Sequence, residues 1–162
     1  MQGTAAPEPR LRPRTASRLA AVQALYQVEQ AGAPAEQVID EFVRHRLAAG
    51  AKGEGAAPGA EVPLFARIVR GWTGGAAALD AAIAASLAEG WPMARLDPVL
   101  RALLRAAASE LFDQAGAPAR VVIDEYLHVA HGFFGAEEPR FANAVMDRLA
   151  RGMRAHEFAA SP

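Results

Sequence analysis

Apolar residues recur with helical spacing through most of this 162-residue chain. From Asp97 to Leu111 the leucines, including Leu100, fall in a narrow arc of about 100°, which predicts a central helix that is buried on that face. Asp97-Pro98 is a typical helix start, because the aspartate can cap free N–H groups and proline fits the first turn. No stretch alternates apolar and polar residues as a strand would. The pattern predicts seven helices, which begin near Arg14, Pro34, Leu64, Leu79, Asp97, Val121 and Pro139.

Three stretches interrupt this pattern and divide the chain. Residues 1–13 are rich in proline and arginine and are expected to form a flexible basic N-terminal arm. Residues 50–61, with the sequence GAKGEGAAPGAE, have no apolar period and predict a mobile linker. Residues 155–162 are expected to form a C-terminal tail. The remainder, 14–154, predicts one all-α domain, a compact bundle of about seven helices in two packed helical subdomains.

Composition excludes several kinds of chemistry. The chain contains no cysteine, which rules out a disulfide, a thiolate zinc site and a cysteine nucleophile. None of its serines lies in a G-x-S-x-G motif and no glycine-rich phosphate loop is present, so we expect neither an enzyme nor a bound cofactor. The sequence lacks a signal peptide and any apolar stretch of roughly 18 residues, which favours a soluble cytoplasmic protein.

Positive charge is concentrated at the start of the chain, although the formal net charge is only −1. The first eighteen positions hold one acidic residue, Glu8, and four arginines: Arg10, Arg12, Arg14 and Arg18. Arg14 and Arg18 lie about 40° apart on the predicted helix, so we expect them to contact two phosphates together. By composition alone the same arginines also fit a solvated tail. Any binding of nucleic acid must come from such a local cluster.

Three ordered blocks of sequence, residues 21–26, 103–111 and 121–147, resemble the NusB family of bacterial transcription antitermination factors. Ala21 to Tyr26 reads AVQALY, as the family's A-V-Q-A-L-Y does. Leu103-Leu104-Arg105 followed by Glu110-Leu111 resembles the family's I-L-R-x-x-x-x-E-L. The resemblance spans about Arg14 to Leu149. The third block resembles the C-terminal signature V-x-I-N-E-x-x-x-x-A-K-x-F-G, then F-V-N-G-V-L-D, through Val121, Ile123, Glu125, Ala130, Phe134, Gly135, Phe141, Asn143, Val145 and Asp147.

The resemblance implies binding of single-stranded boxA RNA. NusB-like proteins use an arginine-rich start of the first helix and the tyrosine of the A-L-Y block for this purpose. In this chain Arg14, Arg18 and Tyr26 take those places. The family often has further arginines between the first two, whereas this chain has uncharged residues there. Arg10 and Arg12 in the arm are therefore expected to compensate.

The resemblance also implies a further RNA contact and a protein partner. Phe141 matches an aromatic residue that contacts RNA in the family, and its place at the edge of the apolar stripe favours exposure over burial. In the family, the small-subunit ribosomal protein NusE joins NusB to form the high-affinity reader of boxA. The pair helps RNA polymerase, within the antitermination complex, to pass terminators in ribosomal RNA operons. A homodimer that masks the RNA surface is the other assembly left open.

Two other interpretations remain. The N-terminal domain of ribosomal RNA cytosine methyltransferases is also NusB-like, so the chain could be a related RNA-binding module without the catalytic domain. Asp124, His128 and His131 lie at i, i+4 and i+7 on one helical face, a spacing that suits a metal site. Because only one Glu-x-x-His unit, Glu125 with His128, occurs in the sequence, a solvated polar face is the simpler interpretation.

Overall fold

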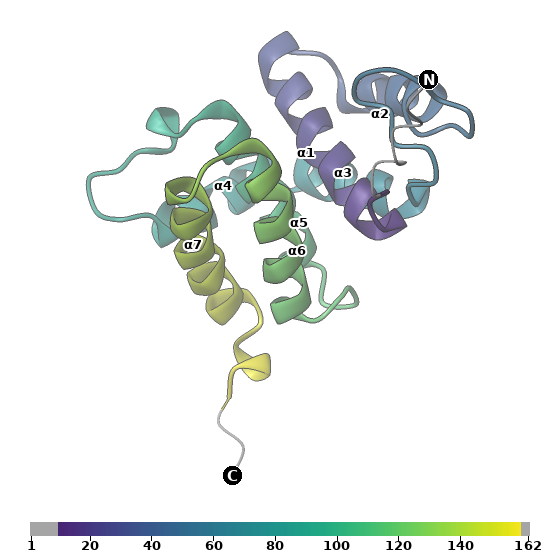
Figure 1. Ribbon diagram of the computed structural model, residues 1–162. Coiled ribbons are helices and arrows are strands. Elements are labelled where there is room, and N and C mark those ends of the chain that lie inside the picture. Colours follow the sequence, from purple (N-terminus) through teal and green to yellow (C-terminus); the bar gives the residue numbers. More distant parts are fainter. Residues whose placement is uncertain (1–9, 160–162) are drawn as a thin grey trace, which may run out of the picture.

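The computed structural model describes residues 10–159 (Figure 1), and within this range it contains seven α-helices and no strand. The predicted all-α class is therefore confirmed. Two short 3₁₀ turns, η1 (Met93–Arg95) and η2 (Ala155–Glu157), complete the secondary structure of this range. The helices are α1 (Pro13–Ala31), α2 (Ala35–His45), α3 (Val62–Gly74), α4 (Ala76–Ser86), α5 (Pro98–Phe112), α6 (Ala119–Phe133) and α7 (Glu137–Met153).

Helix α5 lies at the centre of the bundle. Helices α1, α2 and α3 pack together on one side of it, and α4, α6 and α7 pack on the other, which forms the two predicted subdomains (Figure 1). Leu103, Leu104 and Leu111 on α5 are completely buried, and Leu100 is only 5% exposed. The arc of leucines thus faces the core as the spacing predicted, and Leu100 belongs to that core.

The start of α5 is capped as the sequence predicted. Asp97 Oδ1 accepts hydrogen bonds from the backbone N–H groups of Val99 (2.8 Å) and Leu100 (3.2 Å), and Pro98 occupies the first helical position. These bonds satisfy donors that the first turn of a helix leaves without partners. The cap fixes where α5 begins and how the preceding loop enters it.

The end of α5 is capped by an arginine that the sequence did not reveal. The Arg154 side chain is 2% exposed and donates from its guanidinium to the carbonyl oxygens of Glu110 (3.1 Å), Leu111 (2.7 Å), Asp113 (2.6 Å) and Ala117 (3.1 Å). The last carbonyls of a helix lack partners within it, so a buried guanidinium with five N–H donors is well suited to this end. Arg154 thereby fixes the end of α7 against the end of α5.

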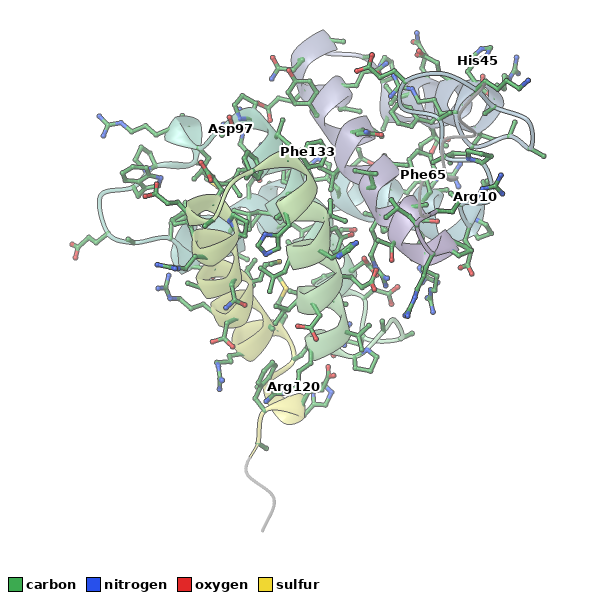
Figure 2. All side chains as sticks on the ribbon, viewed as in Figure 1. Arg10, His45, Phe65, Asp97, Arg120 and Phe133 are labelled. Atoms are coloured by element: carbon green, nitrogen blue, oxygen red, sulfur yellow. The ribbon has the colours of Figure 1, made fainter. Side chains whose placement is uncertain are left out.

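Residues 155–158, the described start of the expected C-terminal tail, contact α6 and α7. Glu157 Oε1 accepts a hydrogen bond from the backbone N–H of Ala119 (3.0 Å), the first residue of α6. The ring of Phe158 lies near the guanidinium groups of Arg120 and Arg151, at 5.2 and 4.8 Å from its centroid. Figure 2 shows Arg120 beside η2. Residues 160–162 lie outside the described range.

The segment expected to be a mobile linker, 50–61, contacts the bundle at several points. The backbone N–H of Ala57 donates to the carbonyl of Arg46 (2.8 Å), and the Ser17 hydroxyl donates to the carbonyl of Glu61 (2.9 Å). Ala57 and Ala60 pack partly buried against the core. Its glycines at 50, 53, 55 and 59 have positive φ angles, which glycine adopts without strain. The contacts bring the segment back along the outside of α2 before α3 begins.

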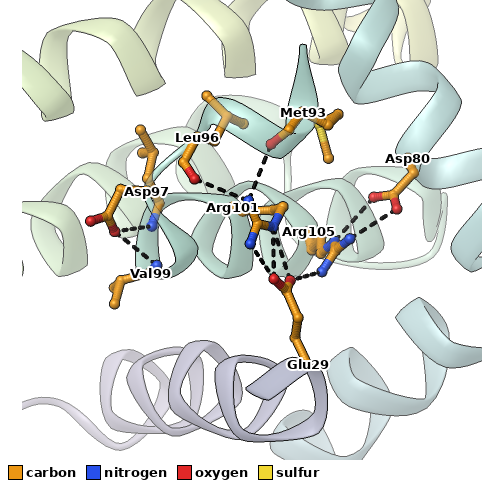
Figure 3. A network of polar contacts seen from close by, with 9 residues as sticks. Glu29, Asp80, Met93, Leu96, Asp97, Val99, Arg101 and Arg105 are labelled. Atoms are coloured by element: carbon orange, nitrogen blue, oxygen red, sulfur yellow. Dashed lines mark hydrogen bonds and ion pairs between the residues drawn. The ribbon is translucent and has the colours of Figure 1, made fainter. Parts of the chain in front are cut away.

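A polar network joins α1 to α4 and α5 (Figure 3). The Glu29 carboxylate accepts hydrogen bonds from Arg101 and Arg105, with Arg101 Nε at 2.9 Å from Oε2. Arg105 also forms an ion pair with Asp80 (3.0 Å), and Arg101 donates to the carbonyl of Leu96 in the loop before α5 (3.0 Å). Hydrogen bonding from Arg101 lowers the pKa of Glu29 below its usual value. The network therefore connects the two subdomains through charged groups.

Within residues 10–159, no helix is long and apolar enough to cross a membrane.

Candidate nucleic-acid interface

Three of the four arginines that the sequence singled out lie at or just before the start of α1. Arg10, Arg12 and Arg14 are all exposed, and Figure 2 shows Arg10 beside the subdomain formed by α1, α2 and α3. Arg14 Nε lies 3.7 Å from Glu61 Oε2, and both side chains are about half exposed, so water screens this pair strongly. Among the described residues, Arg10 and Arg12 form no ion pair. Residues 1–9 of the predicted arm lie outside the described range.

Arg18, one turn later, does not join this group. Its side chain is 2% exposed and donates twice to Glu110, from Nε to Oε2 (2.8 Å) and from Nη2 to Oε1 (3.0 Å). Arg18 Nη1 also lies 3.2 Å from Glu125 Oε2. The expectation that Arg14 and Arg18 contact phosphates together is therefore wrong, because the Arg18 guanidinium is enclosed by protein and its charge is already balanced by carboxylates.

Burial and the neighbouring carboxylates have opposite effects on the pKa of Arg18. Burial alone would lower the pKa of Arg18, but the hydrogen bonds to Glu110 and the carboxylates nearby outweigh it and raise that pKa. The Thr15 hydroxyl donates to Glu125 Oε2 (2.7 Å), which ties α1 to α6. Tyr126 is completely buried beside this cluster, and burial raises the pKa of its phenol. These residues form a polar core between the subdomains, so the Arg18 guanidinium is not exposed as those of Arg10, Arg12 and Arg14 are.

Tyr26 lies in a groove where α1 faces the end of α6. Its side chain is 39% exposed, as is that of Phe133 on α6, whose place at the end of that helix is marked in Figure 2. The groove has a volume of about 640 Å³ and a floor of mixed apolar and amide groups. Its lining includes Val22, Gln23, Tyr26, Gln27, Arg46 and Phe133. Two half-exposed aromatic rings, the cationic side chain of Arg46 and the acidic side chain of Glu54 therefore border one groove.

A second groove continues the first toward the arginines. It has a volume of about 250 Å³ and lies between the first half of α1 and α6. Leu11, next to Arg10 and Arg12 in the chain, lines one end of it, and His128 lines the α6 side. Gln23 and Phe133 line both grooves. A continuous surface thus runs along α1 from the exposed arginines to Tyr26.

The comparisons with known proteins agree with this fold. The sequence model of the NusB family matches residues 15–151. The chain belongs to the NusB family. It is 57% identical over 154 residues to the transcription antitermination protein NusB of Granulibacter bethesdensis, covering 93% of this chain and 94% of the relative. It is 48% identical to the NusB of Gluconobacter oxydans, covering 88% of this chain and 89% of the relative.

A solved NusB structure gives the same picture. The structure of NusB from T. maritima matches with a TM-score of 0.72 and 29% identity, covering 91% of this chain and 97% of that one. The NusB family match begins at residue 15, so it includes Tyr26, Phe133 and Phe141 but not Arg10, Arg12 or Arg14. The exposed arginines precede the part of the chain that the family model matches.

Phe141, the aromatic residue of the NusB signature on α7, lies in a different pocket from Tyr26. This pocket has a volume of about 230 Å³, and Phe141 is partly buried in it. Half-exposed Trp91 and the side chain of Leu96 form its apolar lining. Its other lining residues are Leu100, the basic Arg95 and the acidic Asp97, Glu137 and Glu138. The structure therefore separates the two predicted stacking residues.

Phe133 is the site residue that the sequence interpretation missed. The NusB signature draws attention to Phe134-Gly135, but Phe134 is partly buried against the core and the exposed ring is that of Phe133. The two ring centroids lie 6.2 Å apart. No local signal in the sequence marks Phe133, because its groove position depends on α1 packing against the end of α6.

The alternative metal site finds no support in the geometry. Across residues 10–159, no three or more His, Cys, Asp or Glu side chains come together in a way that could hold a metal ion. Asp124, His128 and His131 are exposed on α6, and His128 lines the second groove. This face of α6 borders the surface along α1.

Proposed function

We propose that this chain is a transcription antitermination factor that binds boxA-type single-stranded RNA together with the ribosomal protein NusE and supports processive transcription of ribosomal RNA operons. The observation that carries the proposal is the continuous surface of this NusB-family fold, which begins at Arg10, Arg12 and Arg14 and leads to the half-exposed rings of Tyr26 and Phe133. Phosphates and unpaired bases are the groups that such a surface attracts.

In this proposal the two ends of the surface do different work. The exposed arginines neutralise phosphates and release counterions, which makes binding depend on salt. Tyr26 and Phe133 stack on bases, and each stacked base contributes on the order of 1–3 kcal/mol. Neither step needs a catalytic group, so the proposed activity is binding without chemistry.

We place Phe141 at a separate position on the RNA path. Its ring is partly accessible beside Trp91. The carboxylates of Glu137 and Glu138 line the same pocket, outnumber the guanidinium of Arg95 there and would repel phosphate. A base could stack there only with its phosphates turned away. Phe141 is therefore proposed as a stacking residue that contributes affinity without salt dependence.

The match to curated relatives favours the antitermination role. The alignment covers 94% of the Granulibacter bethesdensis NusB, a transcription antitermination protein, as well as 93% of this chain. This supports the antitermination reading over a module of a cytosine methyltransferase. The proposal places the chain where RNA polymerase works, in the bacterial cytoplasm.

The test is a binding titration with the organism's own NusE homologue. We expect the chain and NusE to form a one-to-one complex that binds a boxA RNA more tightly than a scrambled RNA of the same composition. Tyr26→Ala should weaken this binding, whereas Phe112→Ala serves as a matched control, because Phe112 is 65% exposed on the end of α5 and lines neither groove along α1. Equal affinity for boxA and scrambled RNA would contradict the proposed function.

A further inference from the structure

Gln23 occupies the junction of the two grooves along α1. It lines both of them, together with Phe133, and it is partly exposed. Tyr26 lies three residues later on the same helix, so the two side chains project from neighbouring positions on one face. Within the described part of the chain, the Gln23 amide makes no hydrogen bond to protein. Its N–H donors and its carbonyl acceptor are therefore available to a ligand held between the two aromatic rings.

We propose that Gln23 reads the edge of an adenine base in the RNA; this inference rests on the proposed function and deepens it. A glutamine amide can donate from Nε2 and accept at Oε1 at the same time, which matches the N7 acceptor and the N6 amino donor of adenine. Stacking on Tyr26 or Phe133 is tolerant of sequence, since every base has an aromatic face. Gln23 supplies the discrimination that the two rings lack.

The neighbouring polar side chains are less suited to this role. Gln27 donates from Nε2 to the Glu41 carboxylate (3.3 Å), and Arg46 stacks over the ring of Phe42 at 4.2 Å from its centroid. Gln30 lines only the larger groove. Gln23 alone among these amides lines both grooves and also neighbours the apolar side chain of Leu19. Such apolar neighbours limit competition from water for the hydrogen bonds to the base.

The experiment combines RNA and protein changes. Each adenine of a boxA RNA is replaced in turn by 7-deazaadenine, which removes the N7 acceptor and leaves the pairing edge unchanged. We expect one position at which the wild-type chain loses about 5- to 150-fold in affinity, the range of one bidentate base contact. Gln23→Leu should bind the unmodified RNA correspondingly less well and should show no further loss with 7-deazaadenine at that position. The salt dependence should stay as in the wild type, because no phosphate contact changes.

A matched control and a second measurement keep the outcomes distinct. Gln37→Leu makes the same change at an exposed position of α2 outside both grooves and should behave as wild type. The wild type could prefer boxA and yet lose no affinity when N7 is removed from any adenine. That result would overturn the inference about Gln23 and leave the proposed function standing, and it requires no variant protein. The inference about Gln23 would also be overturned if a folded Gln23→Leu protein still lost as much affinity as the wild type when 7-deazaadenine replaces adenine. A wild type with no preference for boxA would overturn both.

Discussion

The first and second turns of α1 carry the same residue type for opposite purposes. Arg14 is half exposed and makes one long contact with Glu61, whereas Arg18 is 2% exposed and donates twice to Glu110. Four residues separate them, so the helical period places them on nearly the same face. What differs is the tertiary surroundings: Glu110 of α5 and Glu125 of α6 enclose the Arg18 guanidinium, whereas the Arg14 guanidinium projects beside exposed Glu61.

A cluster of arginines in the sequence therefore does not by itself establish a binding surface. A guanidinium that is already paired and enclosed has little left to offer a phosphate, because leaving its carboxylates unpaired inside the protein would be costly. An exposed guanidinium with a weak partner exchanges that partner readily. We therefore propose that Arg10, Arg12 and Arg14 face the ligand, whereas Arg18 holds α1 to α5 and α6.

The largest expected effect comes from breaking the Arg18 cluster. Arg18→Ala should lower the free energy of unfolding by about 3–5 kcal/mol, because Glu110 would remain as a buried charge without its partner. Denaturant unfolding of the variant and the wild type measures the difference. Replacing both partners with apolar residues, as in Arg18→Met with Glu110→Leu, should recover much of the loss. An Arg18→Ala protein as stable as wild type would show that the contacts of Arg18 with α5 and α6 do not stabilise the fold.

Arg154 provides a second case of a buried arginine. Arg154→Ala should reduce the free energy of unfolding by about 2–3 kcal/mol, because carbonyl oxygens at the end of α5 lose their charged donor. The same denaturant titration measures this loss. Arg151→Ala, three residues earlier and exposed, is the matched control and should cost much less. An equal loss of unfolding free energy in Arg154→Ala and Arg151→Ala would show that burial does not determine how much these arginines stabilise the fold.

The side chains of the Glu29 network are partly exposed, so their burial is intermediate between that of Arg18 or Arg154 and that of Arg151. Glu29→Gln should lower the free energy of unfolding at neutral pH by about 1–2 kcal/mol, discounted for solvent screening. The pKa of Glu29 is lowered in the folded protein, so its stabilising contribution is present above the unfolded pKa of about 4.3 and is lost as pH falls through the lower folded pKa. The stability difference between wild type and variant should therefore shrink in acid. If the difference in unfolding free energy between wild type and Glu29→Gln instead grew as the pH fell, the proposed effect of the lowered Glu29 pKa would be contradicted.

The Asp97 cap shows that an exposed charge can also be structural. Asp97→Ala should cost about 1 kcal/mol of unfolding free energy, because two N–H groups at the start of α5 lose their acceptor. Asp97→Asn retains an acceptor oxygen and should cost less. Thermal or denaturant unfolding can rank the three proteins. If Asn proved as costly as Ala, the capping bonds would not be the source of the effect.

The sequence was informative where local spacing decides the structure. The α5 arc of leucines, the Asp97 cap and the positions of the helices depend on residues a few places apart, and all were predicted correctly. The partners of Arg18 could not be predicted in this way, because Glu110 lies 92 positions further along the chain. The burial of Arg154 and the exposure of Phe133 depend in the same manner on which helices come together. The arginine cluster was therefore visible in the sequence, but its division into two roles was not.

The central claim is that the exposed first turn of α1 binds phosphate while the buried second turn holds the fold. The most direct measurement is the salt dependence of boxA RNA binding by Arg14→Ala and the wild type, with unfolding measured on the same proteins. The account predicts that Arg14→Ala leaves the free energy of unfolding within about 0.5 kcal/mol of wild type and lowers the slope of log affinity against log salt by about 0.7, the value for one phosphate contact on a single strand. A folded Arg14→Ala protein with the wild-type affinity and the wild-type slope would contradict it.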